Sequence, residues 1–385
     1  MASDVNNIQT KILSVEALTQ EQVLAWAELR ASNPALYSPY FHVGYTQLLG
    51  RLCDDVHVLV VSQNATPIAF LPFQARINPA GKVGFARPVG APMTDYHGFI
   101  CAPDTRFDAH DILKQAGFGV YHFSTLIDTG NMLADYVRGQ TPCTIMDLSL
   151  GAEDWRAARD SSYRRHLKSN RRRIRKAQEI GERRFVFHAT DQAVFDQLMA
   201  WKREKFAQSG KYDVLSAGWT QELLNQLWQR GQDAQLRTDM HCMYFGDQLA
   251  AIDLGLSDGT TFHSWMVAYN NAFYNLAPGI QLLEALIDEA ANLGYQRIDL
   301  GEGIDGYKRH YASEDVSVSS GFIALGGPAA ALSKLYGGLE NFGENKLGKL
   351  GRIPGKARRR YTQISACDAT LSGRSKAMLQ AVKGG

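Results

Sequence analysis

The sequence predicts an α/β protein with mixed sheets, built from two similar units in tandem. Two observations indicate this fold class. Short apolar runs bounded by turn residues follow a pair of helical segments twice along the chain. A later segment, residues 269–311, then combines an extended run, a Pro-Gly turn, an amphipathic helix, a strand and a glycine-broken polar loop. At 385 residues, the chain is long enough for two domains that each bury a core.

The first half is predicted to form one complete unit. A strand over 11–15 precedes helices over 20–32 and 41–53. A meander follows, made of four apolar runs separated by turn residues, at 56–63, 67–77, 82–90 and 96–102.

The same order of elements recurs from Arg183. We expect a strand in RRFVFHA, helices over 192–209 and 220–231, and a hairpin within 240–269. DVHVLVV at Asp55 and DMHCMYF at Asp239 occupy matching places in the two halves. This match favours a duplicated α/β unit.

The last predicted elements bring the second unit to its end. A stripe of leucines with helical spacing predicts a helix over 280–293, and a strand over 295–300 follows it. VSVSSGFIAL is the last clear strand, and the chain beyond Gly326 is rich in Gly, Ala, Lys and Arg. We therefore expect units at 1–155 and 156–326 and a basic tail at 327–385.

Positive charge is concentrated in two segments, although the net charge is only +2. Residues 163–184 contain ten Lys/Arg and two acids, and residues 346–385 contain ten and one. The rest of the chain has 21 basic and 36 acidic residues. Two basic patches on an acidic body should collect anionic ligands.

The start of the helix over 280–293 is a candidate cofactor site. Pro278 and Gly279 mark this start, and Ile280 is the first residue of the apolar pattern. Free backbone N–H groups and the positive end of the helix dipole suit a pyrophosphate group there. The alternative is that the Pro-Gly pair only begins the helix.

The end of the following strand is a candidate catalytic edge. Five polar side chains fall within ten positions there, namely Asp299, Glu302, Asp305, Tyr307 and Lys308. Glycines between them permit close approach of a ligand, but they also simply make turns. Asp299 shares a strand face with Arg297, so a structural ion pair competes with a chemical role.

This arrangement resembles the C-terminal half of the CelD/BcsL-like acyltransferases, a FemAB-related branch of the GNAT superfamily. The likeness covers residues 160–311 best, and the arginine-rich helix KSNRRRIRKAQEIG belongs to it. The matching residues are Tyr269, Pro278, Gly279, Gly294, Asp299, Gly301, Gly303, Tyr307 and Lys308. The usual phosphate loop of GNAT enzymes is reduced here to LAPGI.

The resemblance implies two GNAT-like units in tandem and acyl transfer from a thioester, with acetyl-CoA as the expected donor. The pantetheine slot would open where the strands over 261–268 and 295–300 part. Backbone N–H groups of Trp265, Met266 and Val267 would bind the thioester oxygen. An ordinary paired strand is the alternative.

The resemblance also implies chemical roles for the polar residues at the end of the strand over 295–300. Lys308 would neutralise the oxyanion or hold a substrate phosphate, and Tyr307 would protonate the departing thiolate or merely pack. Asp299 is the candidate base or orienting group, with Glu302 and Asp305 as alternatives.

The basic segment predicts a helix with a cationic face, closed by Gly181 as its C′ residue. Lys168, Arg171, Arg172 and Arg175 on this face would hold a diphosphate-linked sugar or a lipid headgroup. A solvated face is the alternative. Nucleic acid is disfavoured, because few aromatics interleave the run and the acidic body opposes a long polyanion.

The basic tail contains a second candidate anion site. Arginine with tyrosine would grip a phosphorylated guanine nucleotide, and we expect cyclic di-GMP or an anionic membrane as alternatives to a disordered tail. The residues concerned are Arg352, Arg358, Arg359, Arg360 and Tyr361.

We expect a cytoplasmic acyl-CoA-dependent N-acyltransferase that acts on an amino sugar or lipid-linked saccharide precursor of exopolysaccharide or cell envelope, with peripheral contact at the inner membrane left open. The alternatives are a FemAB-like aminoacyltransferase that uses aminoacyl-tRNA, and a non-catalytic effector that responds to cyclic di-GMP. We expect no metal, since His241 and His263 lack partners at ligand spacing. Without a GxSxG elbow or a Cys-His pattern, direct transfer is expected.

Overall fold

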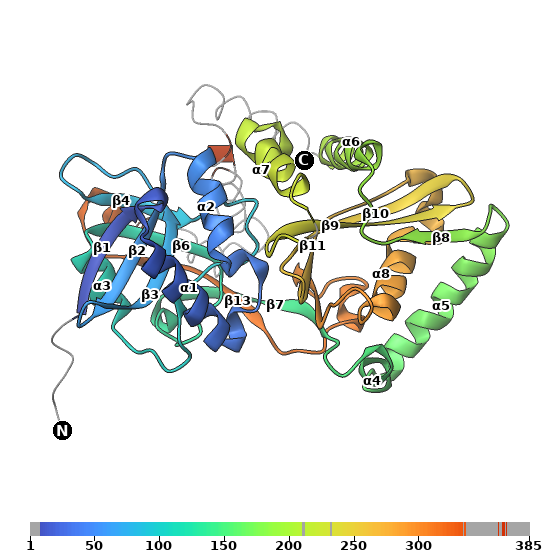
Figure 1. Ribbon diagram of the computed structural model, residues 1–385, viewed down its shortest axis with the longest axis horizontal. Coiled ribbons are helices and arrows are strands. Elements are labelled where there is room, and N and C mark those ends of the chain that lie inside the picture. Colours follow the sequence, from blue (N-terminus) through green and yellow to red (C-terminus); the bar gives the residue numbers. More distant parts are fainter. Residues whose placement is uncertain are drawn as a thin grey trace. The chain divides into compact units, whose positions relative to one another are not determined.

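The computed structural model forms two compact units (Figure 1). It describes residues 8–209, 212–231, 233–333, 335, 361, 364–365 and 367. Unit 1 comprises Met1–Gln140, Val214–Leu223 and Val318–Gly385, and unit 2 comprises Thr141–Asp213 and Leu224–Ser317.

The first part of the chain forms a mixed sheet with its helices. Its strands and helices are β1 (Ile8–Ser14), α1 (Gln20–Ser32), α2 (Val43–Leu52), β2 (Val56–Gln63), β3 (Thr66–Gln74), β4 (Val83–Pro88), β5 (Ile100–Cys101), α3 (Ala109–Gln115) and β6 (Phe118–Leu126). Strands β1 to β4 pair antiparallel in chain order, β5 pairs with β3, and β4 pairs parallel with β6. Short 3₁₀ turns connect them: η1 (Val15–Ala17), η2 (Pro34–Leu36), η3 (Pro39–Phe41) and η4 (Ala134–Tyr136).

The chain from β8 to β12 repeats this order. Its elements are β8 (Arg183–Val186), α6 (Gln192–Gln208), η5 (Val214–Ser216), α7 (Gly218–Trp228), β9 (Arg237–Phe245), β10 (Gln248–Ser257), β11 (Thr261–Tyr269), η6 (Asn271–Leu276), α8 (Pro278–Glu289) and β12 (Arg297–Glu302). Strands β8 to β11 pair antiparallel in chain order, and β11 pairs parallel with β12. DVHVLVV and DMHCMYF lie in the equivalent strands β2 and β9, so the predicted duplication is confirmed.

The two sequence repeats exchange their last strands. Strand β7 (Val137–Asp147) follows β6 in the chain but pairs antiparallel with β12. Strand β13 (Ser317–Ala324) follows β12 but pairs antiparallel with β6. Unit 1 is thus completed by β13, which comes after its other strands in the chain. Unit 2 is completed by β7, which comes before its other strands.

Two helices connect β7 to β8. Helix α4 (Ala152–Ala157) is short, and the predicted basic helix is α5 (Ser161–Gln178), whose N-terminus is capped by Asp160. The predicted role of Gly181 as the C′ residue is wrong, because α5 ends at its C-cap, Glu179, with right-handed backbone angles. Gly181 is required for a different reason, since a Cβ there would lie 2.6 Å from the backbone N of Gly246.

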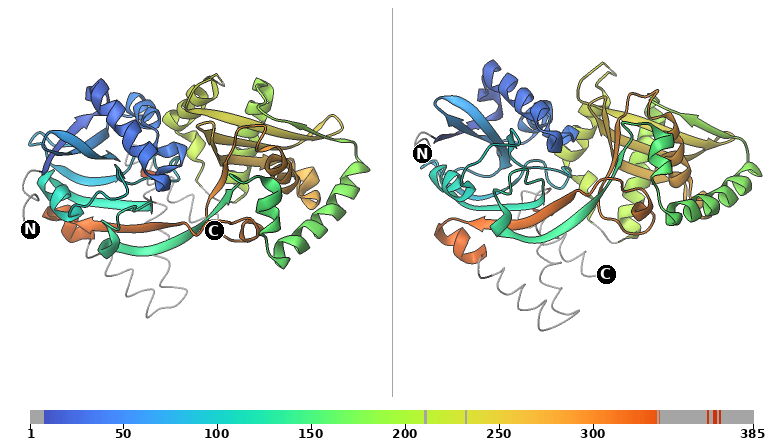
Figure 2. Two further views of the ribbon diagram at one scale, coloured as in Figure 1. Left: turned by 60° about the horizontal axis from the view of Figure 1, so that its bottom comes forward. Right: turned by 90° about the horizontal axis from the view of Figure 1, so that it is seen from below.

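The core of unit 2 lies under α8. The predicted leucine stripe is confirmed, because Leu282, Leu286 and Ile287 are buried against Phe262 and Ile298 of the sheet. Helix α8 ends at Glu289, earlier than predicted, and turns lead to Gly294 at a φ of +83°. Helix α5 packs beside α8 along the outside of unit 2 (Figures 1 and 2). Among the described residues, no helix has the length and apolar character needed to cross a membrane.

Candidate functional site

The candidate site lies where β11 and β12 part. The two strands pair in parallel at three positions, the last of which joins His263 to Asp299. Strand β11 continues to Tyr269 and β12 continues to Glu302. All residues of both strands are described, and beyond His263 and Asp299 none of them pairs with the other strand. The divergence that the resemblance implies is therefore confirmed.

A buried carboxylate shapes β12 at this point. Asp299 Oδ1 accepts a hydrogen bond from the Gly301 backbone N–H at 2.7 Å, and Gly301 has a φ of +73°. The pairing of β12 with β7 shifts register between Asp299 and Glu302. Because a bulge bends its strand, β12 turns away from β11 there. The geometry gives Asp299 a positioning role, and its predicted role as a base stays a prediction.

Arg297 and Asp299 each have another partner besides the ion pair that the strand spacing allows. Arg297 Nε donates to Glu314 Oε1 at 2.8 Å, and the partner that faces Asp299 Oδ2 is His263 Nδ1 at 3.5 Å. Glu314 lies beyond the polar loop, so spacing along one strand could not identify it. His263 and Asp299 are both fully buried.

A second bulge shapes β11. Its register with β10 shifts between Leu254 and Gly255, which leaves Trp265 as the extra residue. Trp265 and Val267 are partly buried and Met266 is buried. The bulge follows directly after the last pair with β12, so both strands bend where they part. Binding of a thioester oxygen by the N–H groups of these three residues stays a prediction.

The N-terminus of α8 lies beside this part of β11. A Cβ on Gly279 would lie 3.9 Å from Val267 Cγ1. No side chain caps α8, and its N-cap residue Ala277 has a left-handed φ of +49°. Helices α1, α3, α5 and α6 all begin with a side-chain cap, from Thr19, Asp108, Asp160 and Asp191. Pro278 has no backbone N–H, and the Ile280 N–H donates to Ala277 O at 3.1 Å. The uncapped start therefore leaves the Gly279 N–H and the positive end of the helix dipole for a ligand, at the predicted place.

Asp253 of β10 is a carboxylate on the same side of the sheet. It stands opposite Val267 on β11, and cross-strand partners lie on one face. Both of its carboxylate oxygens accept from Ser264 Oγ, each at 2.9 Å. Burial raises its pKa to about 7, against the lowering effects of the Ser264 hydrogen bond and of the charges on Lys202 and His263. A carboxyl group with such a pKa exchanges protons near neutral pH.

The polar loop contributes Tyr307. The residue is 37% exposed, yet burial raises the pKa of its hydroxyl to about 12, and the charge on Asp253 is the second cause. The ring of Tyr307 lies edge-on to Tyr311, with centroids 6.1 Å apart.

Among the remaining predicted residues of the loop, Lys308 is partly buried. Lys308 Nζ donates to the carbonyl oxygens of Leu300 at 2.6 Å and Glu302 at 3.1 Å. These bonds tie the 3₁₀ turn η7 (Lys308–His310) to the end of β12. The side chains of Glu302 and Asp305 are exposed. Their roles in catalysis stay predictions.

Glu284 of α8 braces the elements around the loop. Its carboxylate accepts from Tyr311 Oη at 2.7 Å, from Tyr163 Oη at 3.1 Å and from Arg156 Nη2 at 3.2 Å. These donors belong to α4, α5 and the segment that follows η7. Trp155 stacks on Tyr311 in the same cluster. One carboxylate thus fixes α4, α5 and the end of the loop to α8.

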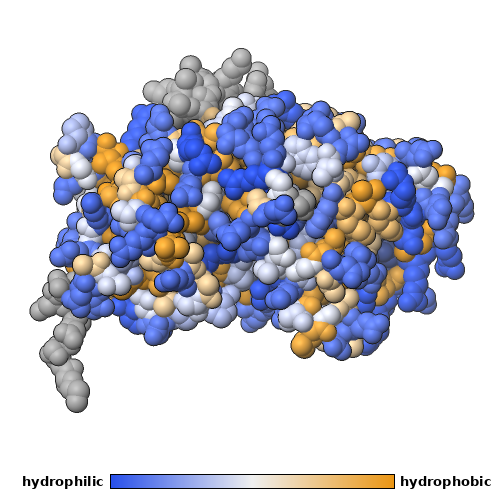
Figure 3. Space-filling view, in the orientation of Figure 1, coloured by the Kyte–Doolittle hydropathy of each residue, from blue (hydrophilic) through white to orange (hydrophobic). Residues whose placement is uncertain are grey.

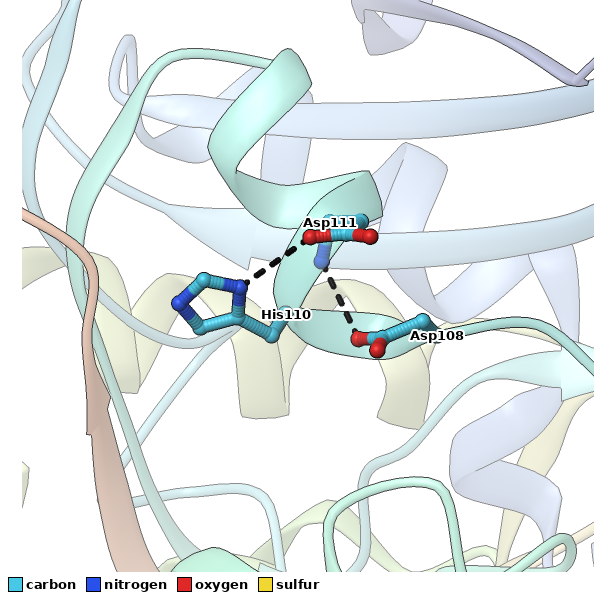
Figure 4. A group of neighbouring side chains, drawn as sticks. All are labelled: Asp108, His110 and Asp111. Carbon is cyan, nitrogen blue, oxygen red and sulfur yellow. Dashed lines mark hydrogen bonds and ion pairs between the residues drawn. The ribbon is translucent and has the colours of Figure 1, made fainter.

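The equivalent region of unit 1 differs at each of these points. After β4, the chain stays on β6, because His97 N donates to Thr125 O and His97 O accepts from Ile127 N. Helix α3, the equivalent of α8, has seven residues and begins with the capping carboxylate of Asp108, which accepts from Asp111 N (Figure 4). Carboxylates at a helix start repel a phosphate. The open strands and the uncapped helix belong to unit 2.

The start of α3 also contains a group of side chains that could in principle hold a metal ion. Among the described residues, Asp108, His110 and Asp111 form a group whose ligand atoms lie within 4.8 Å of one another. Figure 4 shows His110 Nδ1 directed at Asp111 Oδ1, at 3.3 Å. The two aspartates are exposed, and the contacts are those of a helix cap. The absence of a metal stays a prediction.

The two predicted anion sites lie elsewhere. Lys168, Arg171, Arg172 and Arg175 are exposed on α5. Arg352, Arg358, Arg359 and Arg360 lie outside the described residues, and Tyr361 is described as 44% exposed.

Asp253, Ser264 and Glu284 were not identified from the sequence as site residues. For Asp253 a signal exists, because it is a single charged residue in the apolar strand AAIDLGL. Such a carboxylate is seldom fully buried without a role or a partner. Glu284 lies in a regular helical pattern, and its three donors come from distant segments, so the sequence holds no comparable signal for it.

The fold and this site define the class of the protein. Both units have a GNAT-like fold, and residues 162–309 match the sequence profile of the acetyltransferase (GNAT) domain. This match covers the basic helix, the parting strands and the polar loop.

Three solved structures are similar to this chain. FemX superposes with a TM-score of 0.52 at 10% identity, over 84% of this chain and 99% of that chain. A tandem GNAT protein from the clavulanic acid biosynthesis pathway has a TM-score of 0.46 at 12% identity, over 83% and 99%. The C-terminal domain of a putative lysylphosphatidylglycerol synthetase from Agrobacterium fabrum has 0.45 at 13%, over 81% and 94%. At such identities the likeness to FemX shows the fold alone. Among curated proteins, none matches.

Proposed function

We propose that unit 2 transfers an acyl group, acetyl in the first instance, from coenzyme A to an amino group. The observation that carries this proposal is the uncapped start of α8 beside Val267, at the point where β11 and β12 part. The Gly279 N–H and the positive end of the α8 dipole, which suit a diphosphate, thus lie beside bent strands that would hold a pantetheine arm.

The side chains support a direct transfer. A thioester bound there supplies an activated carbonyl carbon. Asp253 accepts the proton of the attacking amine as the new C–N bond forms and the C–S bond breaks. Tyr307 donates a proton to the leaving sulfur. Backbone N–H groups of the Trp265 to Val267 segment stabilise the oxyanion.

Substitution of Gly279 tests the donor site. Gly279→Asp places a carboxylate in the first turn of α8, where it favours the helix dipole but repels a diphosphate. We expect unchanged or raised thermal stability and at least tenfold weaker binding of coenzyme A in calorimetry. Gly279→Ala is the matched control and should bind normally, because its Cβ makes only an ordinary contact with Val267. Equal coenzyme A binding by all three proteins would reject the donor site.

The rate of transfer should depend on pH through Asp253. Its pKa is raised to about 7, so the carboxylate that accepts the proton predominates only above that pH. We expect kcat, followed by thiol release, to rise with pH and level off above about 7. A kcat that is flat from pH 5 to 8 would exclude Asp253 as the base.

We further propose a saccharide acceptor. The resemblance to CelD/BcsL-like acyltransferases supports an amino sugar or a lipid-linked saccharide precursor of exopolysaccharide or cell envelope. Thiol release with acetyl-CoA and a panel of amino sugars tests it. Turnover with aminoacyl-tRNA alone would favour the FemAB-like alternative, and cyclic di-GMP binding without coenzyme A binding would favour the effector.

A further inference from the structure

We propose that the exposed basic face of α5 docks unit 2 on an anionic lipid bilayer. We define this basic face by its seven exposed cations, Arg164, Arg165, Lys168, Arg171, Arg172, Arg175 and Lys176. The proposal concerns where the protein works, and it is independent of the chemistry at β11 and α8.

The basic face is separate from the face by which α5 packs. Tyr163, Asn170 and Ala177 are the buried residues of α5, and they recur every seven positions. The helix contains no Asp or Glu. Among the described residues, no ion pair within 4.0 Å involves any of the seven cations. Arg164 Nη1 donates to Arg159 O at 3.4 Å, and the charge of the basic face is otherwise directed to solvent.

The length of the basic face indicates a surface as its partner. Arg164 and Lys176 are twelve residues apart, which corresponds to about 18 Å along a helix. A single diphosphate contacts side chains of one or two turns, each about 5.4 Å long. More than three turns of uninterrupted cations exceed what one sugar diphosphate uses. A layer of anionic headgroups offers phosphates along the whole length.

The position of α5 favours a planar partner. It lies along the outer edge of unit 2 in every view (Figures 1 and 2), and that edge is hydrophilic in Figure 3. The chain outside the two basic segments has 21 basic and 36 acidic residues, which repel a flexible polyanion that wraps around the protein. A flat bilayer can contact a helix at the edge of unit 2 along its whole length.

Co-sedimentation with vesicles tests the proposal. The full-length protein is mixed, without acyl donor, with vesicles of phosphatidylcholine alone or of equal parts phosphatidylglycerol and phosphatidylcholine. We expect binding to the anionic vesicles only, and its loss at high salt. Lys168, Arg171, Arg172 and Arg175 are changed together to Gln, and we expect at least a tenfold lower partition coefficient, since each surface cation adds to the attraction.

A matched variant controls for net charge. Lys11, Arg76, Lys82 and Lys114 are exposed in unit 1, and changing these four to Gln removes the same charge. We expect less than a twofold effect on partition from this control. The basic tail is present in both variants, so it cannot account for a difference between them.

Three results would overturn the proposal. They are equal binding by the two variants, release from vesicles by millimolar pyrophosphate at constant ionic strength, or tighter binding of polyuridylate than of vesicles. The second would indicate a small-anion site, and the third a nucleic-acid surface. Acyl-transfer activity does not enter any of these measurements, so this proposal and the proposed reaction can fail separately.

Discussion

Asp253→Asn lowers kcat for acyl transfer at least about a hundredfold, while coenzyme A binding stays within a factor of about two. The carboxylate is buried on the side of the sheet that carries Val267 and the start of α8, and it is the group there whose pKa is raised to about 7. Asparagine keeps the shape and can still accept from Ser264, but it cannot take up a proton. Steady-state thiol release and calorimetry measure the two quantities.

The control for this variant is Asp247→Asn, an exposed aspartate in the turn of the same hairpin. It should leave kcat unchanged. A second readout is stability. The folded pKa of Asp253 lies above its unfolded value, so the stability that the protonated form contributes is present at low pH and is lost as pH rises through about 7. Asp253→Asn should therefore unfold at a higher temperature than the natural protein at pH 8. An active, stabilised variant would mean that another group is the base.

Glu284→Ala lowers the free energy of unfolding by about 3 kcal/mol, because the side chains of Arg156, Tyr163 and Tyr311 lose their shared acceptor. The side chain of Glu284 is 13% exposed and that of Arg156 is 26% exposed, so little water replaces the lost bonds. Urea denaturation of the full-length protein measures the change.

Two further variants show how much of the lost stability comes from the charged hydrogen bonds of Glu284. Glu284→Gln keeps one acceptor oxygen and should lose about half as much, as expected when neutral bonds replace charged ones. Glu289→Ala, on the same helix, removes a carboxylate that accepts from Asn292 and should cost less than about 1 kcal/mol. If the Glu284 and Glu289 substitutions had equal effects, the cluster around Glu284 would not be a brace.

Local patterns in the sequence predicted most elements of both units. Helix α1 was predicted with the bounds that the structure has, since a capping box fixes its start at Thr19. The exchange of β7 and β13 was not predicted, because strand pairing between segments nearly 200 residues apart leaves no periodic signal. Similarly, the seven-residue helix α3 and the nine-residue strand β6 that follows it were not recognised.

The candidate site was predicted only in part, because local patterns reveal contiguous residues but not contacts between distant segments. The Pro-Gly start of α8 and the polar end of β12 are contiguous in sequence, so both could be recognised as candidates. Asp253 and Ser264 belong to separate strands, and their contact depends on the register of β10 and β11 with its bulge. Only the folded chain places that pair beside the parting strands.

The exchanged strands have a consequence for synthesis on the ribosome. Unit 1 can acquire β13 only after residues 317–324 have been translated. By then all the elements of the second repeat, from β8 to β12, have already been translated. Until then β6 presents backbone donors and acceptors that β13 will later occupy, a surface on which nascent chains aggregate. Expression of the first repeat alone would make this transient edge permanent.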